Sequence, residues 1–279
     1  MTTIVVTGAN GFLGRHVVAG LRGRASPVLP LSRSPSRDAD GVRIARYQDF
    51  APPAGAVLLH LAEPAAVAAQ AGATHVEAML AQCRALLAQP WARTIYVSSA
   101  AVYGDNTDGP RRPGDPVTAG SAYIQAKLRC ETEVLAAGGT VARLANLFGQ
   151  GMASQTVLPE ILAQLDRCGP LTVRNGKVIR DFLAVEDAAR GLAMLAASTP
   201  APGEIFNFGS GGGHRVEDIA RLVLQFASQG ARQVVSTDRS VSDSCLVLDI
   251  GDTRRRLGWR PEAALETWLE RQVHERIRA

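Results

Sequence analysis

The sequence predicts an α/β fold, with a doubly wound parallel sheet and a smaller C-terminal lobe. Short apolar runs alternate with helix-like segments over the first half of the 279-residue chain, which is typical of a parallel sheet. The run at residues 56–61 is continuous and apolar, as expected for a strand buried on both faces. The alternation changes after about residue 150. We therefore expect residues 1–150 to form the sheet domain and residues 151–279 a smaller lobe, with some segments interleaved.

The individual elements follow from the spacing of apolar residues. In the first half, strands are expected at residues 3–6, 27–31, 56–61, 94–98 and 140–144, and helices at residues 14–21, 76–89 and 121–137. In the second half we expect helices at residues 158–166 and 185–197 and β-segments at residues 171–174 and 205–208. The last 30 residues are expected to be helical and charged.

Composition excludes several classes of protein. Hydrophobic residues make up 46% and charged residues 20%, so a sizeable core is possible and a disordered chain is excluded. The N-terminus has no charged segment before its apolar run, which differs from a signal peptide. The apolar stretch at residues 51–73 is interrupted by prolines, His60 and Glu63, so it does not indicate a membrane span.

The four cysteines are far apart in the sequence: Cys83, Cys130, Cys168 and Cys245. No pair has zinc-finger spacing and no disulfide framework is indicated, so we expect no metal site and a reducing cytoplasm.

The net charge of +4 comes from arginines scattered along the chain. A nucleic-acid-binding surface would need them clustered, so we expect no nucleic acid partner. An anionic small molecule fits this charge, and so does an ordinary solvated surface. Only Lys127 and Lys177 are lysines among the 30 basic residues, which makes each lysine more informative than usual.

A glycine-rich turn directly follows the first expected strand. Its sequence, TGANGFLG at residues 7–14, spaces glycines as G-x-x-G-x-x-G and leads into a helix. Glycine lets the backbone approach a pyrophosphate, and the helix N-terminus offers N–H groups to the anion. A purely structural turn is the alternative. We expect dinucleotide contacts from Gly8, Asn10, Gly11, Phe12, Leu13 and Gly14.

The end of the second strand favours NADP(H) over NAD, although NAD is possible. NAD sites usually place an acid there to bind the ribose 2′-hydroxyl. Here the strand ends at Ser32 and Arg33, and the first carboxylate is Asp38. A small donor and a guanidinium suit a 2′-phosphate. The alternative is that Arg33 is simply a surface arginine.

Tyr123 and Lys127 form a Y-x-x-x-K motif on an expected helix. This spacing places the phenol and the ammonium on one face, about one turn apart. A nearby cation favours the phenolate, so Lys127 together with a cationic nicotinamide is expected to lower the pKa of Tyr123. An amphipathic helix that happens to carry both residues is the alternative. Ser99, at the carboxyl end of its strand, is expected to face the same crevice, whereas Ser98 faces away.

Together these segments resemble the extended short-chain dehydrogenases/reductases, the NAD-dependent epimerase/dehydratase family typified by UDP-galactose 4-epimerase. Matching blocks occur in order along nearly the whole chain: TGANGFLG, VLLHLAEP, VSSAAVYG, YIQAK, RLANLFGQGM, LTVRNGKVIRDFLAVEDAA, FNFGSG and LGWRP. The resemblance implies a Rossmann-type dinucleotide-binding domain over residues 1–150 and a substrate-binding lobe over residues 151–279.

The resemblance also implies roles for individual residues. Ser99, Tyr123 and Lys127 match the family's catalytic Ser/Thr, Tyr and Lys. The remaining matches are Leu61, Ala62 and Glu63 along the cofactor, Asn146 at the substrate diphosphate, and the phosphate-binding arginines Arg180 and Arg239. Either arginine could instead be an ordinary surface residue.

One departure from the family pattern narrows the expected reaction. Ala100 and Ala101 replace the Asp-Glu pair of nucleotide-sugar 4,6-dehydratases, and elimination of water needs an acid and a base there. We therefore expect an NADP(H)-dependent reductase of a keto-sugar nucleotide, acting at C4. The alternatives are an epimerase that retains NAD(P), and a non-catalytic cofactor-sensing protein. The resemblance further implies a homodimer formed by the helix at residues 76–89 and the Tyr123 helix.

Overall fold

A seven-stranded, fully parallel sheet forms the centre of the molecule, as the sequence predicts. The computed structural model describes residues 2–24, 27–35, 40–63, 72–104, 109–238 and 244–278. The strand order is β11-β6-β5-β4-β1-β2-β3. In chain order these strands are β1 (Ile4–Thr7), β2 (Val28–Ser32), β3 (Val42–Arg43), β4 (Val57–His60), β5 (Arg93–Ser99), β6 (Thr140–Leu144) and β11 (Ile205–Phe208).

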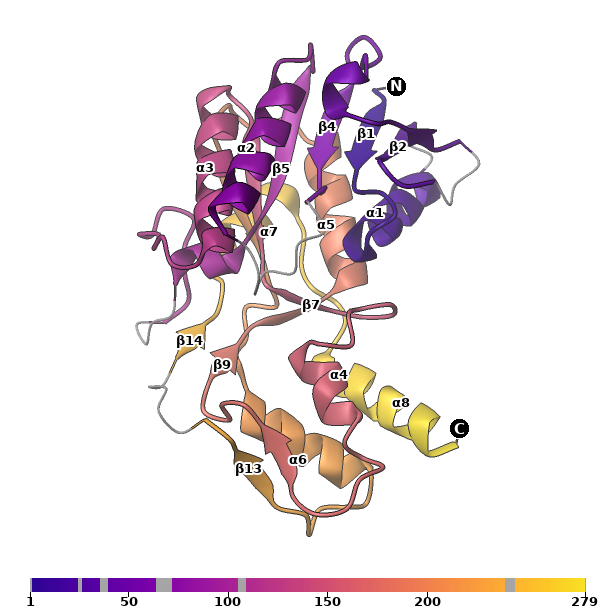
Figure 1. Ribbon diagram of the computed structural model, residues 1–279, viewed down its shortest axis with the longest axis vertical. Helices are drawn as coiled ribbons and strands as arrows, with labels where there is room; N and C mark the ends of the chain where they lie inside the picture. The colour runs from indigo at the N-terminus through magenta and orange to yellow at the C-terminus, as the bar shows by residue number, and fades with distance from the viewer. Residues whose placement is uncertain are drawn as a thin grey trace.

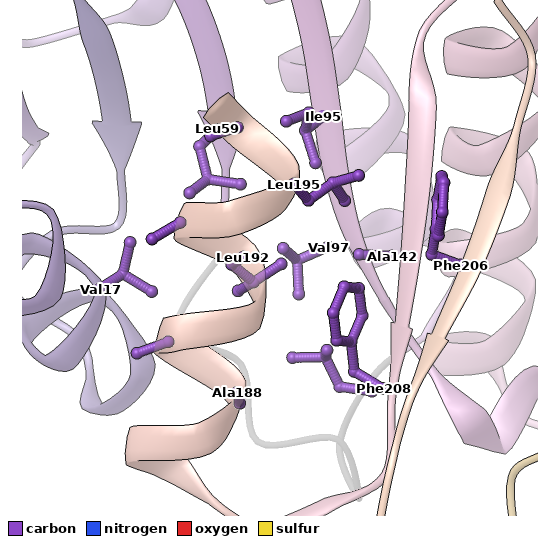
Figure 2. Packing of buried hydrophobic residues seen from close by; sticks show 14 of the residues in the cluster. Val17, Leu59, Ile95, Val97, Ala142, Ala188, Leu192, Leu195, Phe206 and Phe208 are labelled. Carbon is purple, nitrogen blue, oxygen red and sulfur yellow. The ribbon is translucent and has the colours of Figure 1, made fainter. Parts of the chain in front are cut away.

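Helices cover both faces of this sheet. Helices α1 (Phe12–Gly23) and α5 (Val185–Ala197) pack on one face, and α2 (Ala73–Leu87) and α3 (Ala122–Ala136) pack together on the other. Leu59 of β4 belongs to the core under α5, whereas its neighbour Leu58 belongs to a cluster on the opposite face. Figure 2 shows the first of these cores, where Leu192 and Leu195 of α5 lie against β4, β5 and β11. A strand buried on both faces explains the continuous apolar run predicted at β4.

The smaller lobe lies beyond the carboxyl ends of the sheet strands (Figure 1). Its helices are α4 (Val157–Leu162), α6 (Val216–Phe226) and α8 (Leu265–Arg278), which share a second hydrophobic core. Short strand pairs complete it: β8 (Leu171–Val173) with β13 (Val234–Ser236), and β9 (Ile179–Arg180) between β12 (His214–Arg215) and β14 (Cys245–Leu246). A further pair, β7 (Asn146–Phe148) with β10 (Phe182–Ala184), lies where the chain crosses between the two parts.

The second half of the chain returns to the sheet after crossing into the lobe. Helix α5 covers one face, β11 is the edge strand beside β6, and α7 (Gly251–Leu257) contacts β11. Buried Trp259, directly after α7, packs edge-on against Phe208 and donates its indole N–H to the carbonyl of Asp187 at 3.0 Å. Residues on both sides of position 150 therefore build the sheet domain.

Among the described residues, short 3-10 helices occur at Tyr47–Asp49 and Ala100–Tyr103. Within the described ranges, no helix has an apolar stretch of the length that a bilayer requires. The same residues contain no group of three or more His, Cys, Asp or Glu side chains that could hold a metal ion.

Candidate active site

The turn after β1 has the geometry of a dinucleotide cradle. Gly8 has a positive φ of 69°, and a Cβ there would lie 2.9 Å from the Cα of Ala62. A Cβ on Gly14 would lie 2.1 Å from the carbonyl oxygen of Gly8, so the first turn of α1 packs directly on the loop. The amide of Gly11 donates to that same oxygen at 2.9 Å. Positions that exclude side chains, next to a helix N-terminus, suit a pyrophosphate.

Two further residues predicted for this turn, Phe12 and Leu13, begin α1. Phe12 is the first residue of the helix. Its ring packs edge-on against that of His16, with 5.8 Å between the ring centroids. Leu13 is partly buried and packs against the core under the sheet. The structure therefore places both beside the turn.

Thr7 fixes the turn to the neighbouring strand. Its Oγ1 accepts hydrogen bonds from the amides of Leu61 at 3.1 Å and Ala62 at 3.3 Å, so its proton is directed to Nδ1 of His60 at 2.7 Å. Burial lowers the pKa of His60 to about 3, which keeps this imidazole neutral and able to accept. Neither residue is among those predicted from the sequence, where the available signal is a threonine and a histidine that end apolar strands.

Asn10 links the glycine turn to the end of β2. Its Nδ2 donates to Ser32 Oγ at 3.0 Å, to Ser34 Oγ at 2.9 Å and to the carbonyl of Pro35 at 2.8 Å. Ser32 is buried and Arg33 is exposed. The arrangement leaves a hydroxyl where an NAD site would usually have a carboxylate.

Strand β3 adds a second arginine that the sequence analysis missed. Arg43 is exposed and lies in register with Ser32, so the two side chains project from the same face of the sheet. Their neighbours Leu31 and Val42 pack into the cluster on the other face. The first expected carboxylate, Asp38, lies outside the described residues.

Tyr123 and Lys127 occupy the first half of α3, which begins after Ser121. The ammonium of Lys127 is buried and lies 5.8 Å from the ring centroid of Tyr123. Its Nζ donates to the carbonyl of Val97 at 2.8 Å and forms an ion pair with Glu63. The predicted pairing of phenol and ammonium is therefore present, with a carboxylate as a third member.

The pKa of Tyr123 in the protein alone is dominated by burial. Burial raises this pKa above its ordinary value of 10, and this exceeds the opposing effect of Lys127. The charge of Glu63 raises it further, while a hydrogen bond with Ser99 lowers it. For the protein alone, burial and the charge of Glu63 therefore outweigh Lys127. The expected lowering also involves a cationic nicotinamide, and it stays a prediction.

Ser99 ends β5 at the rim of a cavity of about 270 Å³. Its Oγ accepts from the amide of Ala101 at 3.2 Å, which caps the 3-10 helix that follows. Ser98 is buried and does not line this cavity. Besides Ser99, the lining consists of Ala100, Ala101, Gly104, Ile124, Leu144, Ala145, Asn146, Arg180 and Leu246.

Arg180 lines both this cavity and a second one of about 400 Å³ in the smaller lobe. Its Nη1 donates to Ser244 Oγ at 2.7 Å and to the carbonyl of Ile179 at 2.9 Å. Asn146 donates from Nδ2 to the carbonyl of Asp181 at 3.1 Å. The structure thus places two predicted phosphate-site residues, Asn146 and Arg180, on one surface with Ser99. Arg239, the other predicted arginine, lies outside the described residues.

Asp181 explains why the backbone beside Arg180 is held in place. This buried carboxylate accepts from the amide of Ser210 at 2.7 Å, from its hydroxyl at 2.6 Å and from the amide of Leu248 at 3.2 Å. Burial nevertheless raises its pKa above the ordinary value. Three segments far apart in sequence are therefore joined at the floor of the site.

The sequence profile of the NAD dependent epimerase/dehydratase family matches residues 4–209. The chain belongs to this family. One relative is the dTDP-glucose 4,6-dehydratase of Actinoplanes sp., 29% identical over 177 residues, which cover 61% of this chain and 55% of that protein. Another is the dTDP-6-deoxy-L-talose 4-dehydrogenase (NAD(P)(+)) of Kitasatospora kifunensis, 26% identical over 301 residues, which cover 95% and 94% of the two chains.

Solved structures share the fold over the whole chain. MoeE5 in complex with UDP-glucose and NAD superposes with a TM-score of 0.82, 22% sequence identity and 99% coverage of both chains. At this identity the likeness establishes the doubly wound fold with its added lobe.

Proposed function

We propose that this family member is an NADP(H)-dependent oxidoreductase that reduces the C4 keto group of a nucleotide sugar. The observation that carries the proposal is that Ser99, which lines one cavity, is hydrogen-bonded to Tyr123, and that Tyr123 lies beside Lys127. This cavity shares Arg180 with a second one. The first cavity suits a sugar and the second a nucleotide. The named relatives act on dTDP-sugars, and MoeE5 binds UDP-glucose.

The proposed reduction assigns one task to each residue. Bound cofactor supplies the hydride to the carbonyl carbon. Tyr123 donates its phenol proton to the carbonyl oxygen, and the hydroxyl of Ser99 hydrogen-bonds to the same oxygen and orients it. The ammonium of Lys127 stabilises the phenolate that remains. Asn146 and Arg180 bind the diphosphate, because a guanidinium suits phosphate oxygens.

The wall beside Ser99 favours reduction over dehydration. Ala100 and Ala101 line the cavity at this position, and neither can act as an acid or a base. Elimination of water across C5–C6 needs both. Reduction needs only the proton donor that Tyr123 supplies.

Three residues at the edge of the sheet support NADP(H) as the cofactor. Ser32 offers a hydroxyl at the end of β2; the exposed Arg33 follows it directly, and the exposed Arg43 lies in register with it on β3. Two guanidiniums around a small donor suit a 2′-phosphate. Asp40, the nearest described carboxylate after β2, forms an ion pair with Arg22.

A homodimer through α2 and α3 is also part of the proposal. The predicted apolar residues of α2, including Val76 and Met79, are buried within the protomer. The exposed side of the helix pair instead carries ion pairs between Arg84 and Glu133 and between Arg129 and Glu77. Sedimentation equilibrium of the wild type tests the dimer.

The test is NADPH oxidation followed at 340 nm with 4-keto sugars linked to dTDP, UDP, GDP and CDP. We expect turnover with one of them, and a loss of about 10²–10⁴-fold in Tyr123→Phe. Tyr103→Phe is the matched control, because its buried hydroxyl donates to Asn207 at 2.8 Å, whereas that of Tyr123 is hydrogen-bonded with Ser99. C4 epimers formed without added cofactor would indicate an epimerase. Physiological activity that survives Tyr123→Phe would indicate a cofactor-sensing protein.

A further inference from the structure

The carboxylate of Glu63 forms an ion pair with Lys127, the lysine of the candidate site. It follows β4 by three residues, at the carboxyl edge of the sheet, and its side chain is 32% exposed. The side chain of Lys127, with which it pairs, is 3% exposed. Among the described residues, Glu63 is the acid whose charge acts on both Lys127 and Tyr123.

The carboxylate of Glu63 takes up one of the hydrogen-bond donors of Lys127 and balances its buried charge. An ammonium has three N–H donors. One is directed to the carbonyl of Val97 and one to Glu63, which leaves a single donor for a ligand. A buried ammonium without an anionic partner is costly, and burial alone would lower the pKa of Lys127. The charge of Glu63, with a further contribution from Tyr123, reverses this, so that the pKa of Lys127 lies above its ordinary value.

We propose that Glu63 is a positioning residue that holds Lys127 in place and, through its negative charge, keeps Tyr123 in the protonated form needed to donate a proton. The consequence for Tyr123 rests on the proposed reductase function, because reduction consumes a phenol proton whereas oxidation begins from a phenolate. The ion pair itself is independent of that function.

The other groups around the phenol do not replace this effect. From β4, His60 is neutral because burial lowers its pKa to about 3. From β5, burial raises the pKa of Tyr96 well above its usual value, and Ser99 contributes a neutral hydrogen bond. From α3, a hydrogen bond with the Cys83 thiol lowers the pKa of Cys130. These groups are the same in every Glu63 variant, so they cancel in a comparison.

The experiment measures the ionisation of Tyr123 directly. Tyrosinate absorbance near 295 nm is titrated with saturating NADP⁺, and the curve of the same protein carrying Tyr123→Phe is subtracted to remove the other tyrosines. In Glu63→Gln, which keeps the shape and loses the charge, we expect the midpoint to fall by about one pH unit. Glu63→Asp keeps the charge and should stay within about 0.3 units of the wild type. If Glu63→Gln fails to fold, Glu63→Ala, a second neutral variant, should show the same fall of the titration midpoint.

A second readout separates this proposal from the proposed function. If NADPH-dependent reduction occurs, its kcat/KM at pH values above the new midpoint should fall about tenfold in Glu63→Gln and recover in Glu63→Asp. A shifted titration without any turnover would support the role of Glu63 and reject the reductase. Turnover in the wild type with equal midpoints in the neutral variants and the wild type would overturn the role of Glu63. A shift in Asp as large as that in Gln would also overturn it.

Discussion

Gly14→Ala tests whether the contact between α1 and the glycine turn is as close as the structure indicates. The added Cβ would lie 2.1 Å from the carbonyl oxygen of Gly8, 2.8 Å from the Cα of Ala9 and 2.9 Å from the carbonyl carbon of Gly8. All three are backbone atoms, so no side-chain rotation relieves the overlap. Helix α1 must move away from the turn, and the amides that face the pyrophosphate must move with it.

The expected cost follows from overpacking. Inserting a methyl group into a well-packed site typically costs about 1–3 kcal/mol. A loss of about 2 kcal/mol in cofactor binding corresponds to roughly a 30-fold increase in Kd. Gly20 provides the control on the same helix, because its Cβ would have no neighbour within 4 Å. There alanine should stabilise the helix by about 0.5–1 kcal/mol and leave binding unchanged.

The assay combines NADPH titration, followed by cofactor fluorescence, with urea unfolding of both variants. We expect weaker binding and a lower unfolding free energy in Gly14→Ala, with the opposite change in stability in Gly20→Ala. If Gly14→Ala binds NADPH as tightly as the wild type does, the cofactor does not depend on this turn. The main argument for a dinucleotide site would then be refuted.

Three further predictions concern cofactor choice, pH dependence and the buried ion pair. Arg33→Ala and Arg43→Ala should each raise the Kd of NADPH about tenfold or more and leave that of NADH unchanged, because only the former carries a 2′-phosphate; parallel fluorescence titrations check this, and equal effects on both cofactors would contradict it. The folded-state pKa of His60 is about 3, against 6.5 for the model compound, so the unfolded chain gains the proton first as pH falls and stability is lost. The loss between pH 6.5 and 5.5 should be smaller by about 1 kcal/mol in His60→Gln, measured by urea unfolding at both values. Arg143→Met should cost about 3–5 kcal/mol, because it leaves the buried carboxylate of Glu131 unpaired. Adding Glu131→Gln should recover part of this in a double-mutant cycle, and simple additivity would argue against the pairing.

The sequence predicts the elements whose residues carry a strong local pattern. The bounds of β6, α5 and β11 coincide with the predicted ranges, and α3 differs by one residue at each end. Helix α6 was missed although Val216, Ile219 and Val223 have helical spacing and are buried. The two-residue strands of the lobe, such as β9, have no detectable period, because their pairing is set by where the chain crosses.

The candidate site likewise contains residues that a local sequence pattern reveals and residues that only the tertiary structure brings together. Tyr123 and Lys127 can be recognised from the sequence, because a spacing of four positions on one helix fixes where they lie relative to each other. The ion pair between Lys127 and Glu63 joins residues 64 positions apart, and the register of Arg43 with Ser32 depends on strand pairing. Such relations arise from tertiary structure and leave no local signal. The effects of burial and of Glu63 on the pKa of Tyr123 likewise act across elements.

The return of the chain to its sheet has a consequence for any attempt to divide the molecule. A fragment ending near residue 150 would lack α5 and β11. The outer edge of β6 would lose its hydrogen-bonded neighbour, and the face of the sheet that Leu192 of α5 covers would be open to water. We therefore expect that neither piece of a chain cut there folds on its own. Leu246 also lines the pocket that joins Ser99 to Arg180, so this pocket is complete only after synthesis has passed residue 246. In the intact chain, a bound ligand should therefore protect both halves against proteolysis at once.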